Sequence, residues 1–448
     1  MNINTKSKEQ HSKSPVQGAG VQINGAHAFM QALIAEGVDT IFGYPGGAIM
    51  PVFDALYDYH DKVNHILTRH EQGATHAAQG YARVSGKVGV SLVTSGPAAT
   101  NAITGIADAL LDSTPLVVVT GQVGTALLGT DAFQEIDVVG ITLPITKWSY
   151  QIRYAKDIAW AVARAFYIAR SGRPGPVVLD FTKSAQNEKI EFDYQPCNFI
   201  RSYNPVPEIR ISQVEVAAEL INKAEKPYAL VGQGVILANA EKELKEFLEK
   251  ADIPAASTLL GLSAMPTDFR LNKGFLGMHG NVAPNMKTNE CDVLIAIGMR
   301  FDDRVTGDLN TYARQAKIIH LDIDQSEIGK NVAVDAPVLG SVLDSLPALT
   351  KKLKPANHTA WIESFGEHEE RENESVIRKE LYKSEGEITM GEVIHRVTEA
   401  TGNKAIVVTD VGQNQMMAAR YFKYSQTRSM VTSGGLGTMG FGLGAAMG

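Results

Sequence analysis

The chain has 448 residues, and its 42 Lys and Arg against 49 Asp and Glu give a formal net charge of −7. No basic stripe interleaved with aromatic residues runs through it, which argues against a nucleic-acid surface, and no apolar run reaches the ~18 residues of a membrane helix. Cys197 and Cys291 lie far apart, suit a reducing compartment and form no zinc pattern. We therefore expect a cytoplasmic protein of two or three domains, without a nucleic-acid or membrane partner.

Residues 1–20, "MNINTKSKEQHSKSPVQGAG", are polar and lack the apolar core of a signal peptide. We expect a disordered tail here. Glu9 and the absence of arginine count mildly against the alternative, a short transit peptide.

The elements that follow alternate between helix and strand. Apolar spacing predicts a helix in "GAHAFMQALIAEGV" that ends at Gly37, a strand entering a glycine turn in "TIFGYPGG", and a helix in "AIMPVFDALYDY". The alternation continues with "NHILTR" (strand), a helix that begins near Glu71, "VGVSLVTSGP" (strand), "ATNAITGIADALLDS" (helix), "PLVVVTG" (strand) and "RPGPVVLDF", which closes the domain. Short apolar strands separated by helices indicate a parallel sheet covered by helices.

Two more segments show the same plan. After a proline-bearing linker, strands are predicted in "PYALVGQG", "IPAAST", "DVLIAIGMRF" and "KIIHLDID". A charged, helical stretch, "GEHEERENESVIRKELYKSEGE", then precedes "AIVVTDVGQNQ" and "SMVTSGGLGTMGFGLGAAMG", which read as strands entering glycine turns. The predicted fold class is α/β with three doubly wound parallel-sheet domains, the third cut short at Gly448. The predicted parts are a tail (1–20), a first domain (21–188), a linker (189–205), a central domain (206–355), a charged helical linker (356–385) and the start of a third domain (386–448).

Glycine turns beyond strand ends are where parallel sheets bind ligands. The chain has such turns at 43–47, 95–99, 232–234 and 434–440, none of them specific alone. His70 and His76 flank Glu71, but their spacing does not set them on one helical face, so zinc is not expected. A G-x-S-x-G nucleophile motif is absent. From spacing alone, Glu71 is a first-turn glutamate that complements the helix dipole.

A resemblance changes that interpretation. The motifs "GYPGGA", "RHEQGATHAAQGYAR", "TSGPAATN", "GTDAFQE", "RPGPV", "GMHG", "GMRFDDRVTG" and "TSGGLGTMGFGL" occur in the order found in acetohydroxyacid synthase (acetolactate synthase) catalytic subunits, a family of thiamine-diphosphate enzymes. The chain resembles this family from about Val21 to its last residue. "GTDAFQE" and "RFDDRVTG" are similar to the FAD-containing form. The resemblance implies domains of the thiamine-diphosphate decarboxylase type.

The resemblance also implies how thiamine diphosphate is held. Glu71 would hydrogen-bond the aminopyrimidine ring and favour its imino tautomer, and a buried setting strengthens such a bond. Gly437 would offer its carbonyl to the 4'-amino group, and Met439 would support the bent cofactor. Residues at the diphosphate end would be Val411, Gly412 and Gln413, and those at the opposite rim Pro97 and Asn101. Without the resemblance, Met439 reads as core filler.

The implied catalytic residues are Glu71, Gly47, Gln134 and Lys147. Gly47 lies in a turn that would face the reacting carbon, together with Tyr44 and Ala48, although it could equally be a plain turn glycine. Phe133, Gln134 and Lys147 match the substrate funnel, and by pattern alone Lys147 is a solvated charge.

The central domain is expected to hold FAD, with a structural role. Arginines and glycine amides suit a diphosphate, and an acid after a strand suits a ribose hydroxyl; a surface ion-pair run is the alternative for "RFDDR". The implied FAD residues are Arg173, Gly232, Gln233, Gly234, Gly277, Met278, His279, Arg300, Asp302, Arg304, Asp322 and Ile323.

The chain departs from the family pattern at a few positions, namely Ala98, Trp148, Asn414, Met417 and Gly444. The family's Mg2+ motif is expected beyond Gly448, so no metal ligand is assigned within the chain. The implied reaction joins pyruvate to a second pyruvate or to 2-ketobutyrate with loss of CO2, in branched-chain amino acid synthesis. The implied partners are a second copy, as a homodimer or homotetramer, and a small regulatory subunit. A sister decarboxylase or oxidase, and an inactive FAD-binding fragment, are the alternatives.

Overall fold

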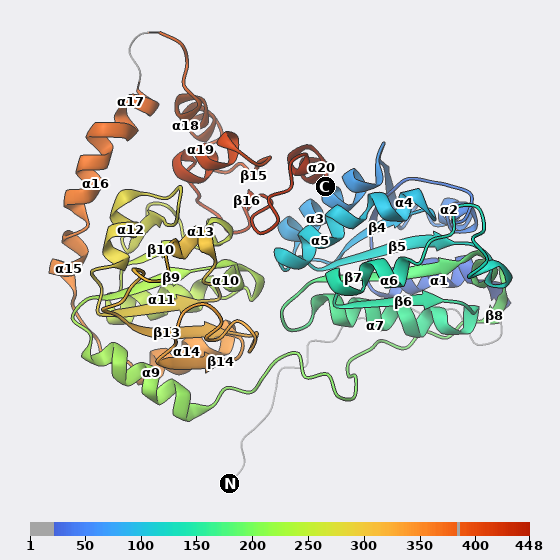
Figure 1. Ribbon diagram of the computed structural model, residues 1–448, viewed down its shortest axis with the longest axis horizontal. Coiled ribbons are helices and arrows are strands. Elements are labelled where there is room, and N and C mark those ends of the chain that lie inside the picture. Colours follow the sequence, from blue (N-terminus) through green and yellow to red (C-terminus); the bar gives the residue numbers. More distant parts are fainter. Residues whose placement is uncertain (1–21, 383–385) are drawn as a thin grey trace.

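The computed structural model describes residues 22–382 and 386–448. The predicted tail, 1–20, and residues 383–385 of the charged linker lie outside the described residues. Figure 1 shows a first domain in blue to green, a central domain in light green to orange, and a third segment in red, which lies between them at the top of the view.

Six parallel strands form the sheet of the first domain, in the order β3-β2-β4-β5-β7-β6. Val117 and Val119 of β5 pack into the apolar cluster on one face, and Leu116 and Val118 into the cluster on the other. Helices therefore cover both faces, as in a doubly wound sheet. The strands are β2 (Thr40–Gly43), β3 (Asn64–Leu67), β4 (Gly89–Val93), β5 (Leu116–Gln122), β6 (Trp148–Ile152) and β7 (Pro176–Thr182).

The helices of this domain lie between the strands, as the alternation predicts. They are α1 (Gly25–Ala35), α2 (Met50–Tyr57), α3 (Glu71–Ser85), α4 (Pro97–Asn101), α5 (Ile103–Leu111), α6 (Val138–Thr142), α7 (Ile158–Arg170) and α8 (Lys183–Asn187). The predicted linker begins with β8 (Lys189–Glu191), which pairs antiparallel with β1 (Gln22–Asn24) and so belongs to the edge of this domain.

The central domain repeats the plan with a parallel sheet ordered β11-β10-β9-β12-β13-β14. Its strands are β9 (Pro227–Val231), β10 (Ala255–Ser257), β11 (Asn272–Phe275), β12 (Val293–Ile297), β13 (Lys317–Asp322) and β14 (Ala336–Leu339). Its helices are α9 (Ile211–Lys223), α10 (Gln233–Leu237), α11 (Glu241–Ala251), α12 (Val282–Thr288), α13 (Asp303–Thr306) and α14 (Val342–Lys352). Alternate residues of β9 pack into different apolar clusters, so this sheet too is buried on both faces.

The charged linker is helical over most of its described length, from Thr359 onward. It contains α15 (Thr359–Glu363), α16 (Gly366–Glu372), a π-helical turn (Asn373–Ile377) and α17 (Arg378–Leu381), which run along the outside of the central domain (Figure 1). The third segment contains α18 (Met390–Ala400), α19 (Gln413–Tyr421), α20 (Phe441–Met447) and a two-stranded parallel sheet of β15 (Val407–Val408) and β16 (Met430–Val431). The α/β class with parallel sheets is confirmed, and the third sheet is short.

Helix α20 packs directly on α3, which joins the third segment to the first domain (Figure 1). The rings of His76 and Phe441 meet edge to face with centroids 5.1 Å apart. A Cβ atom added to Gly80 would lie 2.0 Å from the carbonyl oxygen of Ala445, so the two helices touch through backbone at this point.

Candidate functional site

A cavity of about 960 Å³ lies where the three parts of the chain meet. The central domain contributes residues that follow its strands, such as Gln233 after β9, Thr258 after β10 and Ile323 after β13. The first domain contributes Ser113 and residues 170–174, and the third segment contributes 411–412 and 433–437. The carboxyl ends of parallel strands therefore open into the cavity, and its volume is at the upper end of small-molecule sites.

The residues predicted to hold FAD gather at this cavity. All of them line it except Gly232 and Gly277, which lie next to lining residues in the chain. Gly277 is fixed by Asn285, whose side chain accepts from its N–H at 2.9 Å and donates to its carbonyl at 2.8 Å. The motifs thus identified one contiguous surface.

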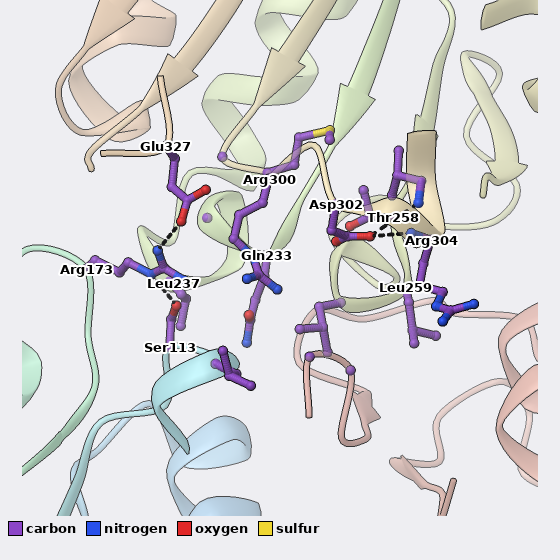
Figure 2. Close-up of a pocket in the computed structure, with 18 of the residues that line it drawn as sticks. Ser113, Arg173, Gln233, Leu237, Thr258, Leu259, Arg300, Asp302, Arg304 and Glu327 are labelled. Atoms are coloured by element: carbon purple, nitrogen blue, oxygen red, sulfur yellow. Dashed lines mark hydrogen bonds and ion pairs between the residues drawn. The ribbon is translucent and has the colours of Figure 1, made fainter. Parts of the chain in front are cut away.

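Arg300 is the cation best placed to meet a ligand. Its half-buried side chain points into the cavity beside Gln233 (Figure 2). Among residues 22–382 and 386–448, no hydrogen bond or ion pair to its guanidinium is recorded. A guanidinium without a protein partner at a cavity wall suits a phosphate or carboxylate group.

Arg173, in contrast, is paired within the protein. It forms an ion pair with Glu327 at 2.9 Å, and its Nε donates to Ser113 Oγ at 2.9 Å (Figure 2). It forms a second ion pair with Asp324 at 3.1 Å. These contacts tie the first domain to the central domain at the cavity rim. Arg304 contacts Met278 Sδ at 3.2 Å, and Asp302 caps α13 by accepting from the N–H of Arg304.

Glu71 occupies the first position of α3 and is only 8% exposed. One of its oxygens, Oε2, accepts a hydrogen bond of 2.9 Å from Nδ2 of Asn101, at the end of α4. His70 caps α3 by accepting from the N–H of Gln72 at 3.1 Å. A buried carboxylate with one oxygen held by an amide is positioned to share a proton with a ligand through the other.

The other residues predicted near the reacting centre lie, like Glu71, in segments that follow the carboxyl ends of parallel strands in the first domain, and Asn101 contacts Glu71 directly. Tyr44, Gly47 and Ala48 form the turn after β2, and this turn is tied to β4 by bonds from Tyr44 N to Leu92 O and from Ala48 N to Thr94 Oγ1. Gln134, with φ of 59°, passes so close to Gly96 that a Cβ there would lie 2.8 Å from its carbonyl oxygen. We call this group the carboxylate face; its members are Tyr44, Gly47, Ala48, Glu71, Pro97, Asn101, Phe133 and Gln134.

Lys147 is not part of the carboxylate face. Its Nζ donates to the carbonyl oxygens of Ile168, Ser171 and Arg173 at 2.6, 2.7 and 2.8 Å, so all three N–H donors are used at the end of α7. Burial and the nearby Arg173 charge lower its pKa to about 8. Neither a solvated charge nor a free substrate contact describes this residue; it holds the loop that borders the cavity.

The third segment brings Val411, Gly412 and Gly437 to the cavity. Gln413 and Met439 are exposed, Met439 by 79%. Glu71 does not line this cavity, so within one chain the carboxylate face and the Gly437 loop border different spaces.

Sequence reasoning missed a buried charged cluster that holds the 433–438 loop. The cluster consists of Arg83 on α3, Asp108 on α5 and Asp112 at the end of α5. These side chains contact the loop through its backbone and hydroxyl groups. Two acids one helical turn apart in the apolar stretch "IADALLD" were the available signal.

Within the described residues, no group of three or more His, Cys, Asp or Glu side chains could hold a metal ion. In that same part of the chain, no helix is long and apolar enough to cross a membrane. Asp410, an acid close to the Gly437 loop, accepts hydrogen bonds from the N–H groups of Val411 and Gly440. Its carboxylate therefore already has hydrogen-bond partners within the protein.

Comparison with known proteins identifies the family. Residues 23–141, 214–349 and 410–448 match the N-terminal TPP binding domain, the central domain and the C-terminal TPP binding domain of thiamine pyrophosphate enzymes. A probable acetolactate synthase large subunit of Methanocaldococcus jannaschii is 46% identical over 438 residues, covering 95% of this chain and 73% of that protein. Acetolactate synthase large subunits of Corynebacterium glutamicum and Lactococcus lactis are both 43% identical, covering 100% and 95% of this chain and 72% and 73% of those proteins. The chain therefore belongs to the acetolactate synthase large-subunit family of thiamine pyrophosphate enzymes.

Proposed function

We propose that this chain catalyses the thiamine-diphosphate-dependent decarboxylation of pyruvate and its condensation with a second 2-keto acid. The second acid is pyruvate, giving 2-acetolactate, or 2-ketobutyrate, giving 2-aceto-2-hydroxybutyrate, in the synthesis of valine, leucine and isoleucine. The observation that carries the proposal is the placement of Glu71, a buried carboxylate at the start of α3 that accepts a hydrogen bond from Asn101. Both residues lie within the long stretch of the chain that is similar to acetolactate synthases.

The residues present fit thiamine diphosphate. When bound, this cofactor supplies the thiazolium carbon that adds to the keto acid and takes up the electron pair left by CO2. Glu71 would hold or release a proton at the pyrimidine nitrogen through Oε1, while Asn101 keeps Oε2 in place. Gly47, which has open space where a Cβ would stand, leaves room for substrate beside it.

Gln134 and Phe133 would border the entry of the second keto acid. Phe133 is 88% exposed and is carried by a loop whose N–H groups at Gly129 and Ala132 are bonded to Glu135. An exposed apolar ring on a fixed loop suits a contact that excludes water once a partner or substrate arrives.

Val411, Gly412 and Gln413 would meet the diphosphate end. The described residues contain no cluster suited to Mg2+, so no step is assigned to the metal.

We propose that the 960 Å³ cavity holds FAD. Arg300 would pair with its diphosphate, and Asp322, at the end of β13, would accept from a ribose hydroxyl through Oδ2, since Oδ1 already accepts from Asp324 N at 2.8 Å. Arg300→Ala should lower the flavin content of the purified protein, whereas Arg314→Ala, on the surface of the same domain, should not. Equal flavin content in both variants would remove Arg300 from the site.

We also propose that the active site is completed by a second copy, in a homodimer or homotetramer, and that a small regulatory subunit binds. The separation of the carboxylate face from the Gly437 loop within one chain supports the first point. Exposed apolar side chains support it too; they are Phe133 of the carboxylate face, Leu67 at the end of β3, and Met439 and Leu443, which follow Gly437 in the chain. The large-subunit names of the relatives support the second.

The test is product analysis with thiamine diphosphate, Mg2+, FAD and pyruvate. We expect acetolactate; acetaldehyde or acetate instead would identify a decarboxylase or oxidase and overturn the assignment. Glu71→Gln should reduce turnover by roughly 100-fold or more while the protein stays folded. Gln72→Glu, which changes its half-buried neighbour in the opposite sense, is the matched control, and wild-type turnover of the Glu71 variant would remove its role.

A further inference from the structure

The 433–438 loop has little regular structure of its own. It is rich in glycine, and Gly437 has a φ of 68°. Such a segment has many accessible conformations, so something outside it must select one. Most of the side-chain hydrogen bonds to the loop come from the first domain, and one comes from Gln415 of α19.

Asp112 holds the start of the loop with both carboxylate oxygens. Oδ2 accepts from the N–H of Gly434 at 2.9 Å, and Oδ1 from the N–H of Gly435 at 2.6 Å. Asp112 is fully buried, and neither oxygen is left to solvent. Two consecutive backbone amides are thus fixed by one side chain.

Arg83 links Asp112 to Thr432, the residue that precedes the loop. Its Nη2 pairs with Asp112 Oδ2 at 2.8 Å, and its Nη1 donates to the carbonyl of Thr432 at 2.5 Å. Nε donates to Thr114 Oγ1 at 3.1 Å, and the guanidinium lies 5.3 Å from the ring centre of Phe441. The planar guanidinium is therefore held on several sides.

Asp108 fixes the far end of the loop. Its Oδ1 accepts from Ser433 Oγ and, at 2.8 Å, from Thr438 Oγ1, while Ser433 Oγ accepts from the N–H of Thr438 at 2.8 Å. Asp108 Oδ2 has no hydrogen bond and lies 3.9 Å from Arg83. Gly437 is thus bracketed by bonded residues on both sides.

Stability alone is a weak explanation for this cluster. Buried ion pairs are often no more stabilising than apolar residues of the same volume, because the charges must first lose their water. What the cluster adds is directional: its bonds specify where the backbone of the loop runs.

We propose that Arg83 and Asp112, assisted by Asp108, are positioning residues that set the conformation of the 433–438 loop and so orient the Gly437 carbonyl toward the aminopyrimidine of thiamine diphosphate. The inference rests on the proposed function, in which this loop binds the cofactor. Glu71 and Arg83 both belong to α3, so one helix carries a proton-exchanging residue and a positioning residue.

The test compares three Asp→Asn changes in the full protein. In Asp112→Asn, one oxygen that accepts a backbone N–H becomes an NH2 group, which opposes that N–H. We expect half-saturation by thiamine diphosphate to rise and kcat to fall, each by roughly 10- to 100-fold. Asp108→Asn should have a several-fold smaller effect, since its Oδ2 has no hydrogen bond to lose. Asp39→Asn, which perturbs a partly exposed contact with Tyr81 of α3 and with Lys87 just after that helix, should match the wild type.

A second readout needs no cofactor. Hydrogen exchange at the amides of Gly434 and Gly435 should accelerate in apo Asp112→Asn and stay unchanged in Asp39→Asn. If Asp112→Asn does not fold, Arg83→Lys replaces it, because a lysine cannot reach Asp112, Thr432 and Thr114 together. Wild-type saturation and exchange in the folded variants would overturn the inference, as would a lower melting temperature with unchanged kinetics. Failure of the wild type to make acetolactate would instead overturn the proposed function.

Discussion

The contact between α3 and α20 predicts opposite outcomes for one substitution at two sites of the same helix. A Cβ at Gly80 would lie 2.0 Å from Ala445 O, whereas nothing lies within 4 Å of a Cβ at Gly73. Ordinary contact begins at 3.4 Å, so Gly80→Ala must move α20 by roughly 1.4 Å, the difference between these distances. Overpacking of this kind costs about 1–3 kcal/mol, while exchanging Gly for Ala within a helix returns about 1 kcal/mol.

We therefore expect Gly80→Ala to lower the free energy of unfolding by up to about 2 kcal/mol and Gly73→Ala to raise it by about 0.5–1 kcal/mol. Urea denaturation followed by circular dichroism measures both, and hydrogen exchange in 441–447 reports whether α20 has loosened. If the two variants shift stability in the same direction, the close backbone contact between these helices is refuted.

Three further predictions concern buried charges. Burial, with the Arg83 charge, lowers the pKa of His76 to about 4, so between pH 6.5 and 4 the unfolded chain binds a proton that the folded protein does not. The free energy of unfolding should therefore fall by about 3 kcal/mol as the pH drops from 6.5 to 4. His76→Gln should not show this fall when unfolding is measured over the same pH range. Burial raises the pKa of Asp180 from 3.8 to about 6, so between these pH values the folded protein keeps a proton that the unfolded chain has lost. The free energy of unfolding, compared with that of Asp180→Asn, should therefore drop by about 3 kcal/mol as the pH rises from 3.8 to 6. Lys147→Met leaves three carbonyl oxygens without this donor and should lower the free energy of unfolding, measured by thermal denaturation, by about 3 kcal/mol. The kcat per folded enzyme should stay unchanged. A loss of turnover without a loss of stability would instead support a catalytic role for Lys147.

The sequence predicted the central strands of both large sheets well and some edge strands poorly. β12 is an uninterrupted apolar run and β5 begins with one, Leu116–Val119, because both faces of the sheet are covered. β6, at a sheet edge, is half-buried over 148–151 and includes Ser149 and Gln151, so neither an apolar run nor a clear alternation marks it. The strand expected in "AIVVTD" is limited to Val407–Val408.

The candidate site was predictable where motifs carry it. Glycine turns and "RFDDR" indicated a cavity wall because they lie next to strand ends in the chain itself. The bonds of Asp108 and Asp112 to the loop join residues more than 300 positions apart, which no local pattern reveals. Lys147 stands between Thr146 and Trp148, with nothing nearby to indicate that three carbonyls of α7 and its following loop converge on it.

The cavity takes its walls from the first domain, the central domain and the third segment. A ligand inside it loses contacts when any one of these parts unfolds, so its binding energy counts against every partial unfolding event. Without ligand, the parts can melt in separate steps; with ligand, calorimetric transitions should move together and approach a single one. A ligand bound in this cavity would thus set how cooperatively the chain unfolds.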